Sequence, residues 1–174
     1  VGDIEEYRLA RRMLDELQTE LNVPPVTTGI MIEVPSAALM ADVLAREVDF
    51  FSIGTNDLTQ YTLAMDRAHP ALASKQDGLH PAVLRLIAKT IDGAHKHGKW
   101  VGICGELGSD PAAVPILIGL GIDELSVNVP SIPLVKAQIR GLKASELQGL
   151  AQQALDCSTA REVRELVKRT LSVS

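Results

Sequence analysis

Apolar residues recur at every third or fourth position from Asp3 to Leu21, and this spacing predicts a helix with one buried face. The helix ends before Pro24 and Pro25, because proline cannot continue it. Beyond the prolines, short apolar runs alternate with helical patterns. The predicted strands cover residues 29–32, 50–53, 100–104 and 124–127. The predicted helices after them cover residues 34–46, 58–65, 81–97, 111–118 and 133–140, with a polar loop at 66–80.

A pair of further helices is predicted for the last segment, residues 143–174. Ser145 is followed three residues later by Gln148, and Thr159 by Glu162. This is the capping-box pattern, in which each side chain binds the other residue's free backbone N–H at a helix start.

Strands that alternate with helices predict a parallel sheet buried on both faces. An open doubly wound sheet and half of an eight-stranded barrel both fit the pattern. Polar residues favour the barrel, because they follow the strands at the end where barrel enzymes hold their catalytic groups. These residues are Glu33, Asn56, Asp57, Cys104 and Glu106. No glycine-rich dinucleotide motif follows the first strand, which disfavours a nucleotide-binding sheet.

Composition is that of a globular domain, with 46% hydrophobic and 22% charged residues in 174. A net charge of −5 and only five aromatic residues argue against a nucleic-acid partner. No apolar run is long enough to span a bilayer, and two cysteines are too few for a disulfide framework, so a cytoplasmic protein is expected. The first residue is not Met, which leads us to expect a piece of a longer protein.

Two carboxylates are candidate metal ligands. Glu33 ends an apolar strand, where an unpaired charge is costly to bury, so it is expected either to bind a metal or to pair with an Arg or Lys. Asp57, with Asn56, either caps a helix at Leu58 or adds a second hard oxygen ligand beside Glu33. Mg²⁺ typically takes one or two carboxylates and leaves its other positions to water and phosphate.

Arg67 and Cys104 complete the candidate site. Arg67 is either a solvated surface residue or a clamp for an anion beside the metal. Cys104 is either a small buried hydrophobe or a reactive thiol at the strand end. Cys157 is interpreted as structural. The histidines offer no metal pair, since His95 and His97 lie two positions apart on one helix.

Three separated motifs resemble those of the phosphoenolpyruvate-utilising enzymes. They are residues 29–35 (GIMIEVP), 50–61 (FFSIGTNDLTQY) and 104–107 (CGEL), in the order and spacing of that family. Within it, the chain is most similar to enzyme I of the bacterial sugar phosphotransferase system, a phosphoenolpyruvate-protein phosphotransferase, or to the same region of a multiphosphoryl transfer protein. Asp66-Arg67 and residues 125–133 favour these over other relatives.

The resemblance implies a fold and a set of roles. The fold is α/β: the C-terminal half of a (β/α)8 barrel of the TIM type, with βα units in residues 1–142 and the helix pair in 143–174. Glu33 and Asp57 would hold Mg²⁺ or Mn²⁺, and Asn56 and Arg67 would bind the phosphate. Cys104 would protonate the enolate to give pyruvate, and an ordinary thiol, with a pKa of about 8.5, keeps its proton at neutral pH. The phosphoryl group would pass to a histidine on another domain and then to the carrier protein HPr.

The chain lacks the first half of that barrel and the segment with the acceptor histidine, so we expect it to be inactive alone. Its outer strands would be exposed edges, which predicts self-association or marginal stability. The resemblance also implies a homodimeric parent. Two alternatives remain open at this point: the C-terminal domain of pyruvate phosphate dikinase or phosphoenolpyruvate synthase, and a regulatory module that binds phosphoenolpyruvate without turnover.

Overall fold

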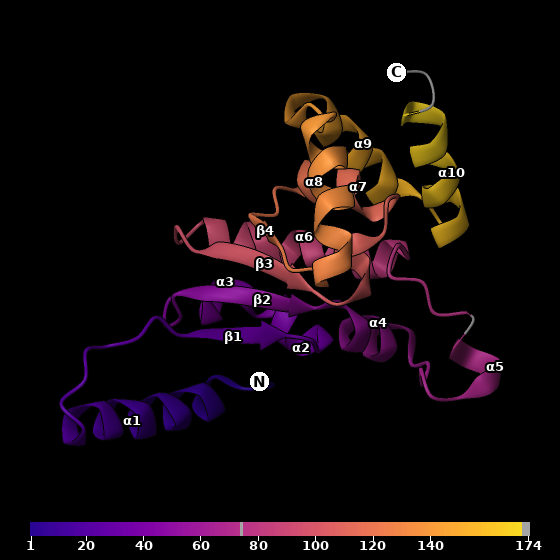
Figure 1. Cartoon of the computed structure of the whole chain (residues 1–174). Helices are drawn as coiled ribbons and strands as arrows, with labels where there is room; N and C mark the ends of the chain where they lie inside the picture. The colour runs from indigo at the N-terminus through magenta and orange to yellow at the C-terminus, as the bar shows by residue number, and fades with distance from the viewer. Residues whose placement is uncertain (74, 172–174) are drawn as a thin grey trace.

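A four-stranded parallel sheet lies at the centre of the computed structural model, which describes residues 1–73 and 75–171 (Figure 1). Its strands are β1 (Gly29–Ile32), β2 (Phe50–Gly54), β3 (Trp100–Cys104) and β4 (Glu124–Leu125), and they lie side by side in chain order. A doubly wound sheet reverses its strand order at a switch point, whereas consecutive strands of a barrel keep it. The predicted fold class, a half-barrel of βα units, is therefore confirmed.

Helices cover one face of this sheet. Alternate strand residues point toward them and are at most 5% exposed; they are Ile30, Ile32, Phe51, Ile53, Val101 and Ile103. These side chains share one apolar core with residues of α2 (Pro35–Leu39), α3 (Ala41–Leu44), α6 (Pro81–His95) and α7 (Ala113–Leu120). At about 25 cal/mol per Å² of buried apolar surface, this face supplies most of the stabilisation of the sheet.

The opposite face is open, which corrects the expectation of a sheet buried on both faces. Met31 is 42% exposed and Trp100 is 40% exposed, and Trp100 stacks on Phe50 with ring centroids 4.4 Å apart. The strands are apolar on both faces, so their sequences predict full burial. No helix among residues 1–73 and 75–171 covers this second face, which a closed barrel would turn inward.

The remaining helices lie around this unit. They are α1 (Ile4–Glu20), α4 (Thr55–Leu63), α5 (Pro70–Ala73), α8 (Ile132–Arg140), α9 (Ala144–Asp156) and α10 (Ala160–Leu171), with 3-10 turns η1 (Glu106–Ser109) and η2 (Val129–Ser131). The predicted helix 34–46 is two short helices that meet at Met40. A Cβ on Gly93 would stand 2.8 Å from the backbone nitrogen of Asp42, so the glycine lets α6 approach closely at this break.

Other element boundaries also differ from the predictions. Strand β4 is two residues shorter than expected, and in the described part of the chain it pairs only with β3. Helix α9 begins at Ala144 without a side-chain cap, so the capping box at Ser145 is wrong. At the start of α10, Thr159 accepts a hydrogen bond from the Glu162 N–H, but the Glu162 carboxylate accepts from Ser158 instead of Thr159.

The two C-terminal helices lie on the outer side of the helical layer (Figure 1). Helix α9 packs closely on α7: Gly119 faces the Leu147 carbonyl, where a Cβ would come within 2.3 Å of that oxygen. Helix α10 is attached through Val163 and Val167, which are buried in the core. Within the described residues, no helix combines the length and apolar character needed to cross a membrane.

Candidate active site at the carboxyl ends of the strands

Helix α4 begins directly at the end of β2 and carries two of the predicted site residues in its first turn. Thr55 is buried and donates a hydrogen bond from Oγ1 to the Cys104 carbonyl at 2.9 Å, which ties α4 to the end of β3. Asn56 and Asp57 follow at the same end of the sheet. The alternative of a cap for a helix at Leu58 is wrong, because α4 already begins at Thr55 and no side chain caps it.

Gly105 lets the next loop approach α4. Its φ of +102° is a left-handed conformation, and a Cβ there would stand 2.5 Å from Thr55 Oγ1 and 3.1 Å from Asn56 Oδ1. The Glu106 N–H then donates to Asn56 Oδ1 at 3.3 Å. Asn56 therefore holds the start of η1 against α4, in addition to any contact it makes with a ligand.

Cys104 ends β3 on the open face of the sheet. It is a free, half-buried cysteine, and its Sγ accepts from Ser52 Oγ and donates to the Ile53 carbonyl, both at 3.5 Å. Both partners belong to β2, so the thiol is held over the neighbouring strand. The thiol is thus half-buried and in polar contact rather than fully enclosed by apolar side chains.

Glu33 follows β1 and is half-buried. Within residues 1–73 and 75–171 no Arg, Lys or His lies within ion-pair distance of it, so the expected alternative of a salt bridge is not found. Its Oε2 lies 3.2 Å from the point where a Cβ on Gly54 would stand. Glycine at position 54 therefore leaves the carboxylate room that any side chain would fill.

Asp57 and Arg67 form an ion pair, with 3.4 Å between Oδ1 and the guanidinium NH2. Arg67 is held at the end of α4, because its N–H donates to Gln60 Oε1 at 3.0 Å. The Arg67 side chain is half exposed, so it is free to bind a further anion.

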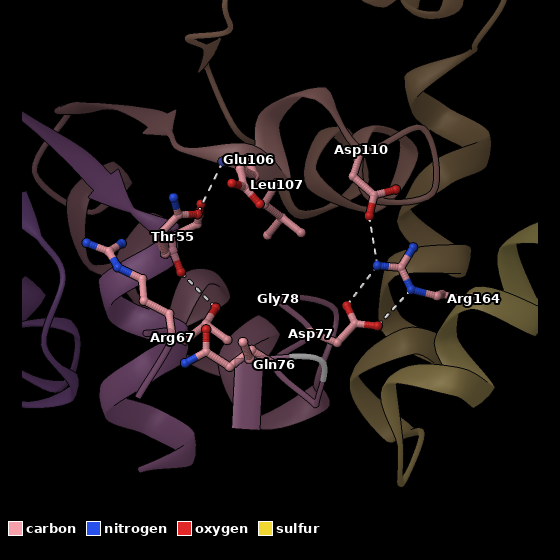
Figure 2. A pocket seen from close by; sticks show the side chains of 12 residues that line it. Thr55, Arg67, Gln76, Asp77, Gly78, Glu106, Leu107, Asp110 and Arg164 are labelled. Carbon is pink, nitrogen blue, oxygen red and sulfur yellow. Dashed lines mark hydrogen bonds and ion pairs between the residues drawn. The ribbon is translucent and has the colours of Figure 1, made fainter. Parts of the chain in front are cut away.

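A cavity of about 390 Å³ opens beside these residues, between α4, η1 and the C-terminal helix (Figure 2). Asn56, Arg67 and Glu106 line it. Cys104 lines a second cavity, of about 310 Å³, with Ser126 and Asn128, and Glu106 borders both. Glu33 and Asp57 line neither cavity. The structure thus brings the predicted residues to one end of the sheet but not into a single pocket.

The donor set fits a hard divalent cation bound together with a ligand. No group of three or more His, Cys, Asp or Glu residues in the described chain could hold a metal by itself. Glu33 follows β1, and Asp57 lies in the first turn of α4 after β2, so the ends of two neighbouring strands each supply one carboxylate, with space left at Gly54. This is the number that Mg²⁺ takes when substrate phosphate and water complete its shell.

Sequence reasoning missed three residues of the larger cavity: Asp77, Asp110 and Arg164. Arg164 donates from Nε to Asp77 Oδ2 at 2.7 Å, and from NH2 to Asp77 Oδ1 and Asp110 Oδ2, each at 2.8 Å (Figure 2). Burial acts to raise the pKa of Asp77, but the hydrogen bonds from Arg164 and the Leu79 N–H prevail and hold it below its ordinary value. The hydrogen bonds to Asp77 and Asp110 raise the pKa of Arg164. Sequence positions 77, 110 and 164 share no motif, so only the fold reveals this cluster.

The histidines have structural partners. His95 bonds to Asp123 and His97 to Asp42, each at 2.8 Å. His95 is exposed and does not lie on the buried side of α6. None of the four histidines lines either of the two cavities described above.

Comparison with known proteins decides the family. The model of the PEP-binding domain of PEP-utilising enzymes matches residues 1–144, most of the chain. The chain belongs to this family. The resemblance predicted from the three motifs is therefore confirmed, and Glu33, Asn56, Asp57, Arg67 and Cys104 all lie within the matched range.

Relatives carry names from one branch of the family. The chain is 55% identical over 166 residues to a multiphosphoryl transfer protein of Xanthomonas campestris pv. campestris, with 95% of the chain and 20% of that protein aligned. A multiphosphoryl transfer protein of Rhodobacter capsulatus matches equally well over the same shares. A phosphoenolpyruvate-protein phosphotransferase of Staphylococcus aureus is 46% identical over 173 residues, with 96% of the chain and 30% of the protein aligned. The chain thus spans a fifth to a third of the length of these relatives.

Proposed function

We propose that this domain contributes the metal- and phosphate-binding half of a barrel that transfers the phosphoryl group of phosphoenolpyruvate to a histidine elsewhere in the full-length protein, and from there to HPr. The observation that carries the proposal is the grouping of Glu33, the Asp57–Arg67 ion pair and the hydrogen-bonded Cys104 at one end of the sheet. The relatives named as phosphotransferases favour this activity over that of a dikinase or a synthase.

In this proposal, charged groups position and stabilise the substrate. Glu33 and Asp57 would hold Mg²⁺, or Mn²⁺, which would supply positive charge to neutralise the phosphate. Arg67 lies beside Asp57 and offers a planar fork to the phosphate oxygens. Asn56 binds a phosphate oxygen while it anchors η1. Positioning and charge stabilisation are most of what phosphoryl transfer requires of a protein.

In the proposed reaction, the phosphoryl group moves to the acceptor histidine and a proton moves to the product. The bond between phosphorus and the enol oxygen breaks, a phosphorus–nitrogen bond forms on the acceptor histidine, and the enolate of pyruvate is left. The Cys104 thiol gives its proton to C3 of the enolate, and solvent then reprotonates the sulfur. Hydrogen bonds to Ser52 and the Ile53 carbonyl hold that sulfur over β2. The product is pyruvate.

The full-length protein is longer than this chain and carries further functional parts. Residues 1–142 supply the βα units and residues 143–174 the helix pair, and this segment is inactive without the rest of the barrel and the acceptor histidine. The full-length protein is a cytoplasmic homodimer. Phosphoenolpyruvate, pyruvate and HPr are its partners, and nucleic acid is not.

The test uses the full-length protein with Mg²⁺, phosphoenolpyruvate labelled in its phosphate, and HPr. Label that reaches HPr without any nucleotide supports the proposal, and pyruvate release that requires AMP supports a dikinase or synthase. Asp57→Asn should lower the transfer rate by at least about 10²-fold, the usual cost of one electrostatic contact to a transition state. Asp92→Asn, a charge change on the outer surface of α6, is the matched control and should leave the rate unchanged. Binding of phosphoenolpyruvate without turnover would favour the regulatory module.

A further inference from the structure

The cluster of Arg164, Asp77 and Asp110, here called the Arg164 clamp, joins three segments that are far apart in sequence. Asp77 lies in the connection between α4 and α6, Asp110 precedes α7, and Arg164 lies on α10. One guanidinium makes three charge-assisted hydrogen bonds of 2.7–2.8 Å to the two carboxylates. All three residues line the cavity that Asn56, Arg67 and Glu106 also line (Figure 2).

Arg164 is not needed to attach its own helix. Val163 and Val167 of α10 are 0% and 5% exposed and belong to the apolar core, so burial holds α10 in place. The Arg164 side chain, by contrast, is 42% exposed and reaches out to the two loops. Its hydrogen bonds therefore act mainly on the loops.

Each aspartate is fixed within its own loop. Asp77 Oδ1 accepts the Leu79 N–H at 3.0 Å, and Asp110 Oδ1 accepts the Ala112 N–H at 2.8 Å. These are local turns in which the carboxylate orders the backbone two residues later. A guanidinium that holds both carboxylates consequently holds both loop backbones.

The loop that contains Asp77 is connected by a hydrogen bond to the segment just before Arg67. Gln76, next to Asp77, donates from Nε2 to the Met65 carbonyl, two residues before Arg67. The Arg67 N–H is itself bound to Gln60. The position of Asp77 is thus linked by short contacts to the residue proposed to bind the phosphate.

The loop that contains Asp110 is connected by a hydrogen bond to η1, which begins at Glu106. The Asp110 N–H donates to the Leu107 carbonyl at 3.2 Å, within η1. The two loops also meet directly, since a Cβ on Gly78 would stand 3.0 Å from Leu107 Cδ1. Without the Arg164 charge, Asp77 and Asp110 would be two carboxylates near each other, and their repulsion would separate the loops.

We propose that Arg164 is a positioning residue for phosphoryl transfer, because it holds the loops of Arg67 and Glu106 at their separation across the cavity. This inference rests on the proposed function. The substrate itself makes no contact with Arg164. Without Arg164, a smaller fraction of the protein has its loops in the binding-competent arrangement. The apparent affinity for phosphoenolpyruvate falls in proportion to that fraction.

The test compares three variants of the full-length protein. Arg164→Ala should raise KM for phosphoenolpyruvate about tenfold and change kcat less than about twofold, since substrate binding restores the loops. Arg164→Lys keeps the positive charge but loses the planar guanidinium that reaches both carboxylates. Its KM for phosphoenolpyruvate should lie between those of the wild type and Arg164→Ala. Arg161→Ala is the matched control: it removes a guanidinium from the same helix that pairs, among the described residues, only with Glu165 at 3.8 Å. It should leave KM unchanged.

Amide hydrogen exchange supplies a readout that does not depend on activity. The Leu79 and Ala112 amides should exchange faster in Arg164→Ala than in Arg161→Ala. The amides of α10 near the buried Val163 and Val167 should stay protected in both variants. Equal KM values in the two alanine variants, or equal exchange at Leu79 and Ala112, would overturn the proposal even if Arg164→Ala melts at a lower temperature. A wild-type protein that transfers no label would overturn the proposed function instead, and the exchange rates would still decide whether the clamp exists.

Discussion

The two faces of the sheet are built from the same strands but differ in what they contact. Ile32, Ile53 and Ile103 point to the covered face and are fully buried under helices. Glu33, Ser52 and Cys104 belong to the open face or its end and are partly exposed, and Ser52 donates a hydrogen bond to Cys104. One face therefore stabilises the fold, whereas the other carries the residues of the proposed site and is left uncovered within residues 1–73 and 75–171.

The largest effect is expected on the covered face. Phe51→Ala removes a fully buried ring and should lower the free energy of unfolding of the 174-residue chain by about 3–5 kcal/mol. Met31→Ala, on the open face of the neighbouring strand, should cost less than about 1 kcal/mol, because its side chain is already 42% exposed. Thermal melting followed by circular dichroism measures both. Equal losses would contradict the division between the faces.

The open end of the sheet should be sensitive to crowding. Gly105→Ala places a Cβ on Thr55 Oγ1 in a left-handed backbone, and should cost about 1–3 kcal/mol and displace Asn56. Gly98→Ala shares the positive φ, at +65°, but has open space around it. Label transfer in the full-length protein should fall in the first variant and not in the second. If the two variants behave alike, backbone strain alone explains the effect.

The uncovered face and the outer strands should promote self-association of the 174-residue chain. Strands β1 and β4 each have one unpaired edge in the described residues, and Trp100 and Met31 are exposed beside them. Sedimentation over a range of concentrations should show dimers or larger species. If the chain is instead monomeric, urea unfolding should show a transition of low cooperativity. A monomer that unfolds cooperatively would count against this expectation.

The smallest effect concerns acid. The folded-state pKa of Asp77 is depressed, so its contribution to stability is present above the unfolded-state pKa of about 3.9 and is lost as pH falls through the folded value. Because the Arg164 clamp is partly exposed, the contribution should be at most about 1 kcal/mol. Urea unfolding at pH 6 and pH 3 should show a smaller acid-induced loss in Asp77→Asn than in the wild type. An equal loss in both would refute this assignment.

Much of the fold could be predicted from the sequence, because the apolar runs and proline positions mark the strands and helices directly. The open face could not, since Met31, Phe50 and Trp100 are as apolar as the buried residues beside them. Motifs pointed to Glu33, Asn56, Asp57 and Cys104 at or just after strand ends, and to Arg67 in the loop after α4, as candidate site residues. The Arg164 clamp escaped this reasoning because its three residues meet only through the packing of α10 on the core.

Pyruvate formation by the Cys104→Ala variant of the full-length protein tests most directly whether the Cys104 thiol protonates the enolate. The rate is measured at saturating phosphoenolpyruvate, and the melting temperature of the same sample is the control. We expect the rate of pyruvate formation to fall by about 10²–10⁴-fold, the usual contribution of a general acid, while the melting temperature changes little. Wild-type rates of pyruvate formation in this variant would contradict the assignment of chemistry to the open face.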